Sequence, residues 1–336
     1  MRCVVYKHGV MKMGKVSFII VNWNGRDLLH ECLESVIRQT YSNFEVIVVD
    51  NASQDDSVDF IRANYPTVNI VQLSENYGFT GGNVAGYRLC HGNFIVLLNN
   101  DAVLVEHWLE SMMSVMSSDS KIGLCASKII IAGTDRIDSV GDTFTTAFSG
   151  TKMGEHEPEH CFNERRPVPG ACAAAAIYRR EMLDQIGFLD EDFFFNHEDT
   201  DLNLRAWLSG WRCMFVPEAV VYHKVSASVG ELSDTGVYYF SRNTVWVWIK
   251  NVPVRLVFFS VLQRVMYEVS SFAFFCIIKG KWSPFLRGKW DAIRKIPHMI
   301  NKRRNIQELF VLPPQIIRSE LIPITSYLML RLRKMM

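Results

Sequence analysis

Short apolar runs recur about every 25 residues along the first hundred positions of this 336-residue chain, and most of them end on a polar side chain. We expect these runs to be strands, because parallel strands covered on both faces are nearly continuous apolar sequences. The four runs are Val16–Asn22, Phe44–Asp50, 68–73 and Phe94–Asn99. Residues at helical spacing predict helices between them, over 28–37, 53–65 and 81–90, the second opened by a capping box of Ser53 and Asp56. This alternation predicts an α/β fold with a doubly wound, mostly parallel sheet flanked by helices.

Polar side chains stand at the carboxyl ends of three of these predicted strands: Asn22, Asp50 and the run Asn99–Asp101. Right-handed crossovers bring such ends to one edge of the sheet, which is where ligands bind in open α/β sheets. Taken singly, Asp50 or Asp101 is equally well explained as a turn or helix-cap residue.

The alternation stops after residue 121. The segments 122–131 and 212–223 are predicted strands, whereas 132–168 is polar and irregular, which favours a functional loop. Two chemical groups appear here: the carboxylates Glu198, Asp199 and Asp201 in "NHEDTDLNLR", and His223 at the end of an apolar strand. Their structural alternatives are first-turn helix charges for Asp199 and Asp201, and a satisfied structural histidine for His223.

The last third of the chain differs in charge and in composition. Residues 226–336 carry 17 Lys/Arg and six acidic residues, a net charge of +11, against −10 for residues 1–225. Val254–Ile278 is long enough to span a membrane, but charged side chains interrupt it. We therefore favour amphipathic helices in the membrane interface, with a span, a buried core helix and a solvated basic face as alternatives. The hydrophobic tail is also compatible with a homo-oligomer.

Several chemistries lack their sequence signals. No GxGxxG follows the first strand, and neither GxxxxGK[ST] nor GxSxG occurs, which argues against dinucleotide-binding, P-loop and serine-hydrolase sites. No nucleic-acid recognition motif accompanies the basic tail, so we expect no nucleic-acid partner. The eight cysteines contain no CxxC pair and the N-terminus has no long apolar run, which favours a reducing, cytoplasmic location.

The remaining polar groups suit metal-assisted transfer chemistry. A single carboxylate and an imidazole can hold a divalent ion, Mg²⁺ or Mn²⁺, whose other ligands are phosphate oxygens and water. Such an ion offsets charge that develops on a departing diphosphate. A separate carboxylate can take the proton from an attacking hydroxyl, which is worth about 10²–10⁴ in rate.

The order of motifs along the chain resembles that of the family 2 inverting glycosyltransferases of the GT-A fold, in particular the rhamnosyltransferase-like branch that builds bacterial surface polysaccharides. The resemblance covers about residues 16–251. It is carried by "VSFIIVNWNGRDLLHECLESVIRQTYSNFEVIVVDNAS", "ENYGFTGGNVAG", "LLNNDAVL", "GFLDEDFFFNHEDTDLNLRAWLSGW", "VPEAVVYHKVSAS" and "YYFSRNTVWVWIKNVP".

The resemblance implies a role for each matching residue. Asp199 is the implied catalytic base, with Glu198 as the less favoured candidate, and Asp101 and His223 are the implied metal ligands. The implied contacts with a uridine- or thymidine-diphosphate sugar come from a larger set, namely Val21, Trp23, Asp50, Asn76, Gly78, Asn83, Asn99, Asn100 and Asp101. The metal motif departs from the family pattern, because Asn99–Asn100–Asp101 holds a single carboxylate where Asp-x-Asp is common. With one carboxylate, we expect weak metal affinity in the absence of the nucleotide.

We therefore predict an enzyme at the cytoplasmic membrane face that moves a sugar from a nucleotide-sugar donor to a hydroxyl of a lipid-linked or oligosaccharide acceptor, with inversion. The expected organisation is an N-terminal segment 1–15, a catalytic domain 16–235 divided near residue 131, and a helical extension 236–336. Two rival hypotheses are a membrane-attached nucleotide-sugar-binding protein without catalysis and a sugar-phosphate nucleotidylyltransferase.

Overall fold

The parallel half of the central sheet contains the four strands predicted from the apolar runs: β1 (Val16–Asn22), β2 (Phe44–Asp50), β3 (Asn69–Gln72) and β4 (Phe94–Asn99). The structure is a computed structural model that describes residues 14–225 and 232–335, so the predicted segment 1–15 falls almost wholly outside it. Helices α1 (Arg26–Ile37), α2 (Ser57–Asn64) and α3 (Gly78–Tyr87) connect these strands. The interior of β1 and β4 is almost fully buried because helices or neighbouring elements cover both faces.

The strand register places the polar ends side by side. Asn22 lies opposite Asp50 in the β1–β2 pair, and Val21 lies opposite Asn99 in the β1–β4 pair. The prediction of one shared polar edge is confirmed.

The second half of the sheet is mixed. β11 (Ala175–Arg179) runs antiparallel between β4 and β6 (Ile122–Ile131), and β12 (Arg212–His223) runs parallel to β6. The remaining strands of this sheet are β5 (Ala102–Leu104), β7 (Ile137–Ser139) and β10 (Arg166–Val168). The helices of this half are α4 (Trp108–Ser118), α5 (Arg180–Ile186) and α6 (Glu198–Leu208). The predicted fold class, a mostly parallel sheet flanked by helices, is confirmed.

Two local predictions are wrong. The segment 132–168 is not one irregular loop, because it contains β7, β8 (Asp142–Phe144), β9 (Gly150–Lys152) and β10, and residues 137–149 are buried. Distant backbone partners hold it, including Gly170, which exchanges hydrogen bonds with Asp142. Ser53 does not cap α2; its hydroxyl accepts a hydrogen bond from the backbone N–H of Asn24 at 2.9 Å.

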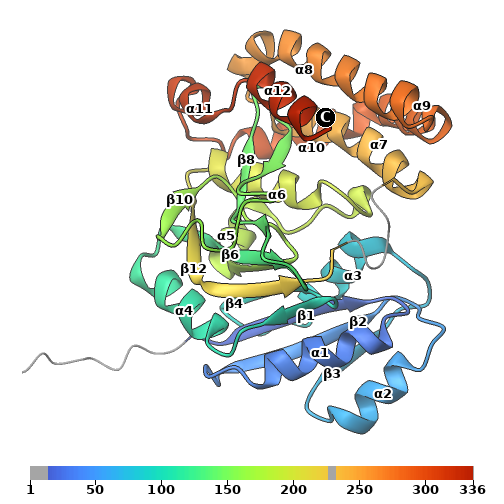
Figure 1. Cartoon of the computed structure of the whole chain (residues 1–336). Coiled ribbons are helices and arrows are strands. Elements are labelled where there is room, and N and C mark those ends of the chain that lie inside the picture. The colour runs from blue at the N-terminus through green and yellow to red at the C-terminus, as the bar shows by residue number, and fades with distance from the viewer. Residues whose placement is uncertain (1–13, 226–231, 336) are drawn as a thin grey trace, which may run out of the picture.

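The C-terminal third is helical. It contains α7 (Asp234–Asn251), α8 (Val257–Phe272), α9 (Trp282–Arg294), α10 (Ile296–Gln307), α11 (Pro314–Glu320) and α12 (Ile324–Met335), with a π-helical segment, Ala273–Ile278, between α8 and α9. Figure 1 shows these helices together at one end of the molecule (orange to red), with α1, α2 and β1–β3 at the other end (blue).

The catalytic part and the helical part share a hydrophobic core. One cluster joins Phe144 and Phe193 to Trp246 of α7 and Ala292 of α9. The predicted boundary near residue 235 falls at the start of α7, and the division into domains stays a prediction. By length and composition, Val254–Ile278 is the one helical stretch of the described chain able to cross a membrane, and 22% of its apolar window is buried.

Candidate functional site

The carboxyl ends of β1 and β2 form a polar floor at the sheet edge. The side-chain amide of Asn100 donates to Asn22 Oδ1 at 2.8 Å, which ties the end of β4 to β1. Asp50 is buried, and its Oδ2 accepts a hydrogen bond from the Ser53 N–H at 3.2 Å. No described residue donates to its second oxygen, Oδ1. A buried carboxylate oxygen without a partner is costly, so the arrangement suits a ligand N–H such as that of a pyrimidine base.

The backbone near Val21 and Trp23 lies beside this floor. Trp23 is 43% exposed, which leaves its ring accessible to a planar ligand, whereas Val21 is half-buried against Gly82 of α3. A Cβ at position 82 would lie 2.7 Å from Val21, so the close packing of α3 on β1 requires glycine there.

The loop before α3 is organised by one amide. Asn51 donates to Asn76 Oδ1 and to the Gly78 carbonyl oxygen, both at 2.9 Å, and accepts from the backbone N–H of Tyr77. Asn83 instead donates to the carbonyl oxygen of Phe79 one turn earlier in α3, and it is buried. The structure therefore brings Asn76 and Gly78 to the end of β2, while Asn83 is engaged within its own helix.

Gly78 makes the closest approach between this loop and the segment that precedes α6. Its φ is +71°, and an added Cβ would lie 2.3 Å from the carbonyl oxygen of Phe194. Two independent reasons thus require glycine: the left-handed backbone and the lack of space.

Asp101 and His223 meet where β4 and β12 end. Asp101 Oδ1 lies 3.2 Å from His223 Nε2, and the side-chain nitrogen of Asn99 lies 3.3 Å from the same ring nitrogen. Both Asp101 and His223 are buried. Two neighbouring ligands of one octahedral divalent ion are about 3 Å apart when each bond is about 2.1 Å, so this pair fits a shared cation.

The second nitrogen of the His223 ring faces Asp138 of β7. Nδ1 lies 3.4 Å from Asp138 Oδ2, the type of contact that orients a ligating imidazole. Burial lowers the pKa of His223, but hydrogen bonds and charge from Asp101 and Asp138 outweigh it and raise the pKa to about 9. The described residues contain no complete group of three or more His, Cys, Asp or Glu ligands. A cation here needs further ligands from a bound diphosphate or water.

The contacts continue from Asp138 to the surroundings of Asp199. Lys152 of β9 forms an ion pair with Asp138 at 2.5 Å. Burial raises the pKa of Asp199 and the charge of Lys152 opposes this rise, while burial and then the charge of Asp199 raise the pKa of Asp142. Asp101, His223, Asp138 and Lys152 are thus joined by direct contacts, and Lys152 acts on Asp199 through its charge.

Asp199 and Glu198 open α6. Asp199 Oδ1 accepts the backbone N–H of Thr200 at 2.6 Å; burial raises its pKa, and this hydrogen bond opposes the shift. Glu198 is buried, and burial followed by the charge of Asp199 raises its pKa to about 8. Its Oε2 is among the buried atoms without a hydrogen-bond partner. Asp199 takes part in no ion pair among the described residues, so no cationic side chain competes with a proton for its carboxylate.

Asp201 has a structural role at the start of α6, an alternative that the sequence analysis left open. It is fully buried and paired with Arg205 at 3.0 Å and with Lys250 of α7 at 2.9 Å. Asn251 donates to it as well, at 2.8 Å. With its oxygens occupied, Asp201 anchors α6 to α7.

The segment before α6 is clamped from α7. Phe194, Asn196 and His197 all have positive φ angles, an unusual conformation for residues other than glycine. The side-chain amide of Asn243 lies 2.7–3.0 Å from the carbonyl oxygens of Phe193, Phe195 and Asn196. Arg242 donates to the carbonyl oxygens of Asp192 and Phe193 at 2.8 Å. These contacts place the start of α6, and with it Asp199.

Sequence reasoning did not select Asp138, Asp142, Lys152, Arg242 or Asn243 as site residues. The first three lie in the segment taken for a loop, where nothing in the pattern signals a buried carboxylate. Arg242 and Asn243 lie within "YYFSRN", which did stand out as a motif.

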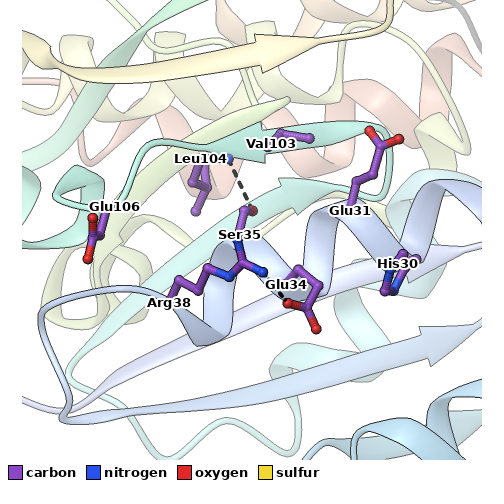
Figure 2. Close-up of a pocket in the computed structure, with 8 residues that line it drawn as sticks. All are labelled: His30, Glu31, Glu34, Ser35, Arg38, Val103, Leu104 and Glu106. Carbon is purple, nitrogen blue, oxygen red and sulfur yellow. Dashed lines mark hydrogen bonds and ion pairs between the residues drawn. The ribbon is translucent and has the colours of Figure 1, made fainter.

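A separate cavity of about 490 Å³ lies between α1 and β5. Figure 2 shows His30, Glu34 and Arg38 of α1 around it, with Glu34 paired to Arg38 at 2.9 Å. Its other lining residues are Glu31, Ser35, Val103, Leu104 and Glu106, and none of these is a predicted site residue.

The sequence matches the family model described as "Glycosyl transferase family 2" over residues 17–199, more than half of the chain. It is 28% identical over 225 residues to the glycosyltransferase YwdF of Bacillus subtilis, covering 66% of this chain and 79% of that protein. It is 31% identical over 104 residues to the UDP-Glc:alpha-D-GlcNAc-diphosphoundecaprenol beta-1,3-glucosyltransferase WfaP of Escherichia coli. This match covers 30% of the present chain and 39% of WfaP. It is also 28% identical over 228 residues to the protein y4gI of Sinorhizobium fredii. This match covers 64% of the present chain but only 25% of y4gI.

The structure resembles that of GalNAc-T7 with UDP, GalNAc and Mn²⁺, with a TM-score of 0.57 and 17% identity, covering 70% of this chain and 48% of that one. This likeness shows the fold, which is the GT-A fold. The match of the family model over more than half of the chain establishes that the chain belongs to glycosyl transferase family 2.

Proposed function

We propose that the protein is an inverting glycosyltransferase that moves a sugar from a nucleotide-sugar donor to a hydroxyl of a lipid-linked or growing glycan. The observation that carries the proposal is the series of contacts from Asp101 through His223 and Asp138 to Lys152 of β9, a strand whose Gly150 packs against Thr200 beside Asp199. It joins a pair suited to a cation with an unpaired, half-buried carboxylate. In this proposal the series supplies both requirements of the transfer reaction, a cation site and a base.

Donor binding follows from the floor at β1 and β2. The unpartnered Asp50 Oδ1 accepts a base N–H, Trp23 presents its ring, and the loop at Asn76 and Gly78 lies beside the sugar and diphosphate. The UDP bound in the GalNAc-T7 structure supports UDP as the nucleotide, and the name of WfaP supports UDP-glucose. The rhamnosyltransferase-like branch remains our sequence prediction, as does a donor that carries either uridine or thymidine diphosphate.

Asp101 and His223 would hold a divalent cation, Mn²⁺ or Mg²⁺. Such a cation neutralises charge on the diphosphate leaving group. Asp138 orients the His223 ring through Nδ1, which leaves Nε2 directed toward Asp101 and the cation. Lys152 pairs with Asp138, which limits the negative charge gathered beside the cation.

Asp199 acts as the base in a single displacement. It takes the proton of the acceptor hydroxyl while the oxygen bonds to the anomeric carbon and the bond to the diphosphate breaks. An α-linked donor therefore gives a β-linked product. The raised pKa of Asp199, caused by burial, increases its proton affinity and suits this task.

The acceptor is proposed from the relative WfaP, and the location from the basic helices of the C-terminal third. The name of WfaP specifies a diphosphoundecaprenol acceptor, which supports a lipid-linked acceptor here. We place the enzyme at the cytoplasmic face of the membrane as a peripheral protein, with its basic helices toward the lipid.

The test measures nucleoside diphosphate released from a panel of nucleotide sugars with Mn²⁺ and a bacterial lipid extract, followed by NMR of the anomeric linkage. Asp199→Asn is expected to lower turnover by at least about 10² while the donor-induced thermal shift persists. Glu110→Gln, an exposed carboxylate on α4, is the matched control. Pyrophosphate release would instead indicate a nucleotidylyltransferase, and donor binding without release would indicate a binding protein. A fully active Asp199→Asn variant would remove the assignment of the base.

A further inference from the structure

α8 is polar on the side that faces the protein and apolar on the side that faces solvent. Its buried residues are Ser260, Arg264, Tyr267 and Ser271. Its exposed apolar residues, here called the α8 face, are Phe258, Val261, Leu262, Val265, Val269 and Phe272, which are 42–95% exposed. At 100° per residue, the α8 face occupies an arc about 100° wide. A surface helix of a water-soluble protein has the reverse polarity.

An ion-pair cluster fixes this orientation. Arg264 pairs with Glu268 one turn later, and Glu268 pairs with Lys289 of α9 at 2.6 Å. Rotating α8 to bury its apolar face would break these partly buried pairs, which is costly. The same charges disfavour a membrane-spanning helix, because Arg264 and Glu268 lie near the middle of Val254–Ile278.

Basic and aromatic residues flank the α8 face. Arg255 precedes α8, and Lys279 with Trp282 follows the π-helical segment, all three exposed. Trp, Lys and Arg in such positions are typical of the headgroup layer, and cationic side chains are attracted to anionic lipids. The net charge of +11 over residues 226–336 complements that surface.

We propose that the α8 face docks on an anionic lipid bilayer, with α8 lying along the membrane surface and its polar side against the protein. A contiguous exposed apolar face on a helix marks a site of interaction, and a bilayer would remove its side chains from water. In Figure 1, α8 forms the outermost layer of the helical end, away from β1–β3, so a flat surface can reach it.

The docking surface is connected to the segment that follows β8. Tyr267 of α8 belongs to a hydrophobic cluster with Ala147 and Tyr327, and Ala147 follows β8, which carries Asp142. β8 pairs with β9, whose Gly150 packs against Thr200 beside Asp199. Under the proposed function, on which this step rests, a bilayer against α8 holds a lipid-borne acceptor beside the domain that carries the base.

The test is co-sedimentation of the full chain with phosphatidylcholine vesicles, with and without phosphatidylglycerol. Leu262→Asp/Val269→Asp places two carboxylates on the α8 face. The control Ala63→Asp/Thr67→Asp adds the same charge at exposed positions on and after α2. Wild type and control are expected to bind the anionic vesicles, and the α8 variant to bind at least about tenfold more weakly. Thermal unfolding verifies that all three proteins are folded.

Three results would overturn the proposal. The first is vesicle binding by the α8 variant equal to that of wild type, or none by wild type. The second is resistance of the membrane-bound protein to alkaline extraction, which would show a span. The third is a wild-type dimer that the α8 variant dissociates, which would show a second copy on this face. Donor breakdown in solution is expected to be unchanged in the α8 variant, so failure of docking and failure of the proposed reaction are separate results.

Discussion

The backbone N–H of Thr80 donates a hydrogen bond to the carbonyl oxygen of Phe194 at 3.1 Å. Thr80 belongs to α3, next to the loop assigned to the donor, and Phe194 precedes the helix that carries Asp199. The bond therefore joins the donor loop to the segment that positions the base.

Gly78→Ala tests this junction. The added Cβ would meet the Phe194 oxygen at 2.3 Å, on a backbone with φ of +71°. We expect a loss of unfolding free energy of about 2–4 kcal/mol and a fall in kcat/KM, because the strain displaces the start of α6. Urea unfolding and steady-state kinetics measure the two effects.

Gly133→Ala is the matched control for that variant. Gly133 has φ of +77° but nothing within 4 Å of an added Cβ. It should lose only about 1 kcal/mol, from backbone strain alone, and keep full activity. Equal effects of the two substitutions would contradict the proposed junction.

Asn243→Ala tests the clamp from α7. The substitution removes the donor of the Phe195 and Asn196 carbonyl oxygens, while the Phe193 oxygen keeps its hydrogen bond from Arg242. We expect turnover to fall about 10- to 100-fold while the Kd for nucleotide changes less than about twofold, because the base and not the donor floor is displaced. Kinetics and calorimetry separate these quantities.

The control for the clamp is Asn64→Ala, which removes an exposed amide that donates to the carbonyl oxygen of Phe60 at 2.8 Å. Its turnover should stay at the wild-type value. If Asn243→Ala weakens nucleotide binding as much as it lowers turnover, a general loss of structure explains the effect better than positioning.

Glu198 predicts a pH dependence of stability. Burial and the charge of Asp199 raise its pKa from 4.5 to about 8, so the folded protein holds a proton that the unfolded chain releases. In this window the folded state binds more protons, and the stability contributed by Glu198 falls as pH rises from about 4.5 to about 8. Glu198→Gln removes this slope and should be more stable than wild type at pH 8 by a few kcal/mol.

Urea denaturation of wild type and Glu198→Gln from pH 5 to pH 8 measures the difference. The gap between the two proteins should widen with pH. Parallel profiles would mean that Glu198 ionises normally in the folded state.

His223→Ala tests the cation site. Loss of one of two protein ligands should weaken Mn²⁺ binding in the presence of UDP about 10- to 100-fold, measured by electron paramagnetic resonance of free Mn²⁺. His107→Ala, on an exposed histidine before α4, is the control and should bind normally. Unchanged Mn²⁺ affinity in His223→Ala would place the cation elsewhere.

The local pattern of the chain determined the secondary structure near the site. Runs such as Phe44–Asp50 form strands of a parallel sheet whose two faces are both buried. Burial on both faces makes the strand sequence nearly continuously apolar, so the strand can be recognised from its own residues. The polar ends Asn22, Asp50 and Asp101 could be placed on one edge because crossover handedness is general. The family followed from the motifs in their order, and the match to the family model confirmed it.

Only the tertiary structure decided which polar residues are partners. Asp138 and Lys152 join the site because β7 and β9 fold back beside it, a consequence of long-range pairing that local periodicity does not encode. The orientation of α8 was likewise undetermined by composition, since an apolar helix containing Arg264 and Glu268 can bury either face. The contact with Lys289 of α9 decides it, because the paired charges must stay on the protein side.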